Sequence, residues 1–62
     1  MSNFEELIEQ VKRTHVDVKD RILTLRDKHQ NLNDNFAIAG AYELAWVEAD
    51  LRTLLVYWGY ED

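Results

Sequence analysis

Apolar and half-apolar residues recur along the first half of the chain at alternating steps of four and three residues. The members of this series are Phe4, Ile8, Val11, His15, Val18, Ile22, Leu25, His29 and Leu32. Such a seven-residue repeat places its members along one side of a helix. Ser2 precedes the repeat and Glu5 follows three residues later, which is the pattern of a capped helix N-terminus. The pattern predicts a helix over about residues 3–30.

A cluster of polar residues interrupts the repeat and predicts a turn over residues 31–34. Asn31 is a candidate for the left-handed residue that ends the first helix, because asparagine tolerates that backbone conformation. Asn33 and Asp34 are candidates for capping the next helix through their side-chain oxygens. A connection this short favours two antiparallel helices that pack side by side, and so an all-α hairpin.

The second half of the chain predicts a helix over about residues 34–58, with Gly59 as its stop signal. Its apolar positions divide between two faces at 100° per residue. The face that begins at Phe36 pairs in antiparallel register with the repeat of the first helix, and the small Gly40 falls opposite Leu25. The predicted intrachain core consists of Ile8, Val11, His15, Val18, Ile22, Leu25, Leu44, Val47, Leu51, Leu54 and Trp58.

The opposite face of the second helix has no partner within a chain of two helices. It carries Ile38, Tyr42, Ala45, Trp46, Ala49, Val56, Tyr57 and Tyr60. Left exposed, these side chains would form an apolar patch larger than the few hundred Å² that a monomer usually presents. Burying one large apolar side chain contributes roughly 1.5–3 kcal/mol. The pattern therefore predicts a twofold homodimer whose second helices meet within a four-helix bundle, with Val16 and Leu23 beside the interface.

The chain has 62 residues, which limits it to a single domain over residues 1–62. A domain of this size buries only about 60% of its unfolded surface, so it usually needs a disulfide, a metal or a partner. The chain contains no Cys, and its two His residues are far apart, so neither a disulfide nor a zinc site is expected. Association with another chain is the remaining source of stability, which agrees with the two-faced second helix.

The formal net charge is −5, and the acidic surplus lies entirely in the second half of the chain. Residues 1–33 hold six acids and six bases, whereas residues 34–62 hold six acids against Arg52 alone. An acidic chain is a poor general binder of nucleic acid. The sequence has no apolar run of membrane-spanning length and no signal-peptide pattern at its start, so we expect a cytoplasmic protein without membrane contact.

His15 and His29 lie on the hydrophobic repeat and are the candidate chemical groups of the chain. A histidine in such a position can be a pH sensor, a metal ligand or a general base. No neighbouring residue has the spacing of a metal site, so we expect both rings to pack as spacers that bond to a carboxylate or to water. Protonation of a buried His15 would oppose packing, and mild acid is therefore expected to loosen the hairpin.

These patterns predict a protein that binds other proteins and catalyses no reaction. The sequence contains no glycine-rich phosphate loop and no nucleophile triad that a hairpin could assemble, so no catalytic residue, cofactor or metal is expected. The expected activity is that of a homodimer which binds a larger protein and modulates or inhibits it. Free-standing chains of this length are common among the regulators of phages and mobile elements, which favours that class.

Three other functions remain open from the sequence. The bases between Lys12 and Lys28 give the first helix a face that can touch RNA phosphates, and some helical-hairpin dimers bind RNA. The second apolar face suits an obligate subunit of a hetero-complex equally well. The acids of the second half suit a mimic of DNA, although they form no dense row.

Overall fold

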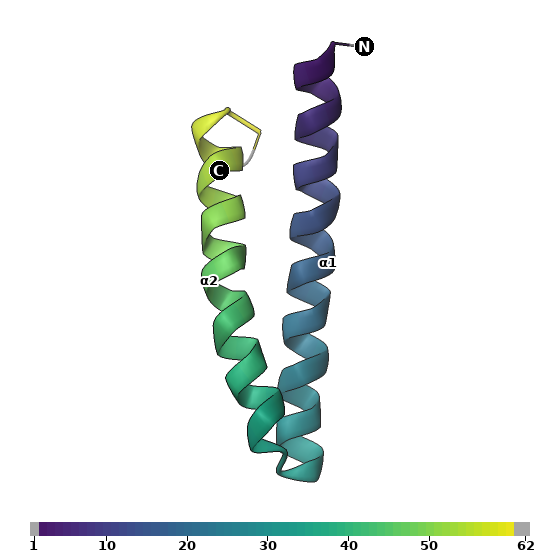
Figure 1. Cartoon of the computed structure of the whole chain (residues 1–62), viewed down its shortest axis with the longest axis vertical. Helices are drawn as coiled ribbons and strands as arrows, with labels where there is room; N and C mark the ends of the chain where they lie inside the picture. Colours follow the sequence, from purple (N-terminus) through teal and green to yellow (C-terminus); the bar gives the residue numbers. More distant parts are fainter. Residues whose placement is uncertain (1, 61–62) are drawn as a thin grey trace.

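The computed structural model describes residues 2–60, which form two antiparallel helices joined by a two-residue turn (Figure 1). Helix α1 spans Asn3–Leu32 and helix α2 spans Asn35–Tyr57. The hairpin is a rod with principal extents of 45 × 18 × 15 Å. The all-α hairpin predicted from the sequence is confirmed, whereas its pairing into a four-helix bundle stays a prediction.

The turn is shorter than predicted, because α1 continues two residues beyond residue 30. Asn33, rather than Asn31, adopts the left-handed conformation, with φ 52° and ψ 42°. The prediction for Asn31 is therefore wrong. Asp34 caps α2 as one of the two predicted candidates, since its carboxylate accepts the backbone N–H groups of Phe36 and Ala37 at 3.0 and 3.2 Å. Two adjacent residues thus end one helix and begin the next.

The outer ends of the helices are capped by residues that the sequence identified. Ser2 Oγ accepts the backbone N–H of Glu5 at 3.1 Å, as the capping pattern predicts. Helix α2 ends at Tyr57, one residue before the predicted end, and Gly59 follows with φ +82°. The Gly59 N–H donates to the Val56 carbonyl and the Tyr60 N–H to the Leu55 carbonyl, at 3.0 and 2.9 Å. This pair of bonds is the Schellman motif that a left-handed glycine allows.

The two glycines are expected to respond in opposite directions to substitution by alanine. Gly59→Ala should lower the free energy of unfolding by about 1–2 kcal/mol, because a Cβ opposes the left-handed backbone. Gly40→Ala should raise it by about 0.5–1 kcal/mol, because glycine weakens a helix interior. A Cβ at Gly40 would lie 3.4 Å from Leu25 Cδ1, which is ordinary contact. Urea unfolding followed by circular dichroism measures both changes, and two changes of the same sign would contradict this account.

A heptad repeat on α2 forms the contact with α1. Its members are all buried or half-buried and are Ala37, Ala41, Leu44, Glu48, Leu51, Leu55 and Trp58. On α1, Ile8 and His15 are buried. The other core positions expected on α1 are half-buried, namely Val11, Val18, Ile22 and Leu25. The core is therefore a thin seam along the rod rather than a central cluster.

The prediction that Val47 and Leu54 belong to this core is wrong, because both side chains are exposed. Phe36, which the sequence pattern places on the same face, is 92% exposed. Leu55 is instead among the most deeply buried residues that the structure describes. At 100° per residue, the contact face of α2 is rotated by roughly 60° from the predicted one.

Two features of the sequence explain this rotation. Ala37 and Ala41 are small, so the two backbones can approach closely near the turn when these residues face α1. Glu48 turns inward because its carboxylate bonds to the buried ring of His15. A pattern of apolar residues alone excludes Glu48 and places Val47 on the contact face instead.

The hairpin widens from the turn toward the chain ends (Figure 1). At the open end the rings of Phe4 and Trp58 meet edge to face, with centroids 5.5 Å apart. The Lys12 ammonium lies 4.9 Å from the centroid of the Tyr60 ring. Small residues near the turn and large ones at the open end together account for the tapered shape.

Candidate functional site

The side of α2 that points away from α1 carries large apolar side chains. This outer face comprises Tyr42, Trp46, Ala49, Val56 and Tyr57. Trp46 is 77% exposed and Tyr57 is 85% exposed, and the rings of both lie outside the seam between the helices. Tyr42 and Val56 are also exposed, whereas Ala49 is half-buried. The structure thus brings five of the predicted interface residues onto one face of one helix.

The other three residues of the predicted interface lie elsewhere. Ile38 is half-buried and Ala45 is exposed, and both line a hollow between the helices that Tyr42 borders at the edge of the outer face. Tyr60 follows the end of α2, and its ring receives the cation of Lys12. Tyr60 is therefore partly used within the chain, and less of its surface is left for a partner.

Sequence reasoning missed two exposed apolar residues beside the turn. Leu32 ends α1 and Phe36 lies in the first turn of α2, and both are well exposed. Because each fits a hydrophobic repeat, the pattern places both on the seam between the helices. The position of the two-residue turn fixes the rotation of each helix, and so distinguishes these two exposed residues from the residues of the seam.

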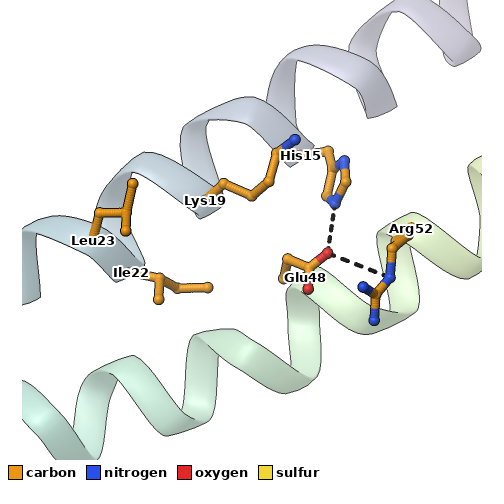
Figure 2. A pocket seen from close by; sticks show the side chains of 6 residues that line it. All are labelled: His15, Lys19, Ile22, Leu23, Glu48 and Arg52. Carbon is orange, nitrogen blue, oxygen red and sulfur yellow. Dashed lines mark hydrogen bonds and ion pairs between the residues drawn. The ribbon is translucent and has the colours of Figure 1, made fainter. Parts of the chain in front are cut away.

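A shallow groove runs along one side of the hairpin. It consists of two hollows of about 410 and 360 Å³ that share Ile22. The first is lined by His15, Lys19, Ile22, Leu23, Glu48 and Arg52 (Figure 2). The second is lined by Ile22, Arg26, Ile38, Ala41, Tyr42 and Ala45. We call this combined feature the basic groove, because its cations Lys19, Arg26 and Arg52 outnumber its acid, Glu48.

A polar pair formed by the buried His15 and the half-buried Glu48 joins the two helices at one end of the basic groove. His15 is 3% exposed, and its Nε2 lies 2.8 Å from Glu48 Oε2 (Figure 2). Arg52 Nε lies 3.7 Å from the same oxygen. The hydrogen bond with His15 lowers the pKa of Glu48, against the opposing effect of burial, and the positive charge of Arg52 lowers it further. The pair fixes the rotation of α2 and keeps Glu48 ionised.

This geometry bears on the response to acid. The loosening by mild acid that the sequence predicts through His15 stays a prediction. The lowered pKa of Glu48 makes this carboxylate a group through which acid weakens the seam. His29 lies at the turn, where its Nδ1–H donates to the Asp34 carbonyl at 3.2 Å. Among residues 2–60, no three His, Cys, Asp or Glu side chains gather as they would around a metal ion.

The opposite side of the hairpin has the opposite charge. Its hollow is lined by Asp17, Asp20, Arg21, Thr24, Leu25, Gly40, Glu43, Leu44 and Val47. Three acids against one base give this side a lining charge of −2. Three bases against one acid give the basic groove +2, with both His residues taken as neutral. The charge of the chain is thus divided between the two long sides of the hairpin.

The comparisons with known proteins add no relative. No protein-family model matches the chain, and the searches of curated proteins and of solved structures gave no match. Neither α1 nor α2 combines the length and the hydrophobicity that crossing a membrane requires.

Proposed function

We propose that the chain is a non-enzymatic protein-binding module that forms a homodimer through the outer face of α2. The observation that carries this proposal is the exposure of Tyr42, Trp46 and Tyr57 on one face of a helix. Tyr and Trp are the side chains that dominate protein interfaces, because they bury a large area with few rotatable bonds. Burying each contributes roughly 1.5–3 kcal/mol, which a thin two-helix core lacks.

The exposed area of the single hairpin supports the same proposal. The chain exposes 5018 Å², whereas a folded monomer of its 7.4 kDa is expected to expose roughly 4,200 Å². The excess of about 800 Å² is the area that one partner buries in an interface of standard size. A second copy that covered the outer face would bring the exposed area to that of an ordinary small protein.

A twofold axis beside α2 is the simplest arrangement for this dimer. The outer faces of the two copies then meet, Trp46 lies near the centre of the contact, and the two hairpins form an assembly of four helices. Leu32 and Phe36 at the turn remain outside this contact. They supply surface for the larger protein that we propose the dimer binds and modulates or inhibits. The proposal includes a cytoplasmic location and a role as a regulator of the phage or mobile-element type.

Sedimentation of the purified chain tests the homodimer. We expect a dimer for the natural chain and a monomer for Trp46→Glu, because the interface cannot solvate a buried carboxylate. Circular dichroism should show that this monomer has lost much of its helix. The matched control is Phe36→Glu, which adds the same charge at a more exposed site on α2 and should stay dimeric. A natural chain that sediments as a folded monomer would refute the proposal.

A further inference from the structure

We infer that the basic groove binds an acidic amphipathic helix of a partner protein. This inference rests on the proposal that the chain is a protein-binding module, and it names the chemistry of the partner. The groove lies between α1 and α2 and borders the outer face at Tyr42, which lines its second hollow. A helix seated there would contact both helices of the hairpin.

The floor of the groove suits the apolar side of a helix. Leu23 is 57% exposed, and it lies next to Ile22 on the same side of the pair formed by His15 and Glu48 (Figure 2). Ile38, Ala41 and Ala45 continue the apolar lining in the second hollow. The α1 wall runs from His15 to Arg26, which at 1.5 Å per residue is roughly 16 Å, or three helical turns. Three turns present the i, i+3 or i+4, and i+7 anchors with which amphipathic helices dock.

The cations of the groove select an acidic partner. Lys19 and Arg26 are seven residues apart on α1, so they project from the same side two turns apart, and Arg52 lines the hollow of Lys19 from α2. Glu48 is paired with Arg52 at 3.7 Å and offsets its charge, so Lys19 and Arg26 carry most of the positive charge that a ligand meets. In a chain of net charge −5, a groove lined with a charge of +2 is the surface that an acidic helix complements.

Two other occupants fit the groove less well. A second copy that used the same groove across a twofold axis would bring Lys19, Arg26 and Arg52 toward their own counterparts, and like charges in a contact are unfavourable. Nucleic acid would bind the cations through its phosphates. The apolar side chains of Leu23 and Ile22, however, can form neither hydrogen bonds nor ion pairs with a phosphate backbone. The apolar floor and the cations of the groove together therefore favour a protein helix with acidic flanks.

The test uses the full chain and a synthetic helical peptide as the probe. The peptide has leucines at heptad positions a and d and glutamates on both flanks, and calorimetric titration measures its binding. We expect binding that weakens with salt, as contacts between opposite charges do. A Lys19→Glu/Arg26→Glu variant should bind at least about tenfold more weakly, because two attractions become repulsions. The control is Arg21→Glu, which reverses one charge on the opposite side of α1 and should bind as the natural chain does. It is matched to the single variant Lys19→Glu, which should bind more weakly than the natural chain.

Several results would overturn the inference. One is equal binding of a peptide in which lysines replace the glutamates, and another is an Arg21→Glu variant that weakens binding as much as the groove variant. Competition by single-stranded RNA would assign the groove to nucleic acid. A Lys19→Glu/Arg26→Glu variant that no longer self-associates would assign it to a second copy. The outer face is tested at Trp46 and the groove at Lys19 and Arg26, so either proposal can fail while the other stands.

Discussion

Leu55→Ala is expected to lower the free energy of unfolding by about 2–5 kcal/mol, because the cavity left by a buried leucine cannot fully close. Leu55 is 2% exposed and belongs to the heptad repeat of α2 that faces α1. Small domains have total stabilities near the lower end of roughly 5–15 kcal/mol, so this single change should leave much of the protein unfolded at ambient temperature. Urea unfolding followed by circular dichroism, at fixed protein concentration, measures the loss.

The matched control is Leu54→Ala, the same change one residue earlier. Leu54 is 42% exposed, so we expect a loss below about 1 kcal/mol, since less apolar surface is returned to water. This pair of variants compares the observed rotation of α2 with the one that the sequence pattern predicts. A larger loss for Leu54→Ala than for Leu55→Ala would show that the observed rotation is wrong.

Glu48→Gln is expected to lower the free energy of unfolding by about 1–3 kcal/mol near neutral pH, because a charge-assisted hydrogen bond at the helix seam is lost. It should also change the response to acid. The pKa of Glu48 is lower in the folded chain than its ordinary value, so the unfolded chain takes up the proton first as the pH falls. The stability that Glu48 contributes is therefore present above about pH 4.5 and is lost as the pH falls through the folded pKa.

Chemical unfolding of both chains between pH 7 and pH 3 tests this account. The difference in stability between the natural chain and Glu48→Gln should shrink as the pH falls below about 4.5 and through the folded pKa of Glu48. Glu43→Gln is the control, because Glu43 is an exposed glutamate on the same helix and should give a small difference at every pH. Parallel curves for the natural chain and Glu48→Gln down to pH 3 would contradict the assignment.

The helices and the hairpin could be predicted because their signals are local. A long heptad repeat, a serine cap and a polar cluster each act within a few residues, and tertiary packing does not oppose them. The sequence does not fix the position of the turn, because three asparagines lie within five residues at positions 31, 33 and 35. Any of these can adopt a left-handed backbone, so only the packing of the two helices selects Asn33.

The rotation of α2 could not be predicted from its apolar pattern, because the pattern does not distinguish which apolar residues face α1. Helix α2 is apolar over most of its circumference, so several rotations bury a similar area. The choice is made by a polar contact between His15 and Glu48, two residues 33 positions apart. The basic groove depends on that rotation. The sequence alone therefore does not show that the residues lining the groove come together.

The tapered shape of the hairpin has a consequence for the order in which the chain folds. The turn consists of Asn33 and Asp34, so closing the first contacts between α1 and α2 near Ala37 costs little loop entropy. We expect each further turn of helix to form its contacts next to those already made. The contacts of Leu55 and Trp58 with α1 then form last. Changes at the open end should therefore act mostly by speeding unfolding, and changes near Ala37 and Ala41 by slowing folding.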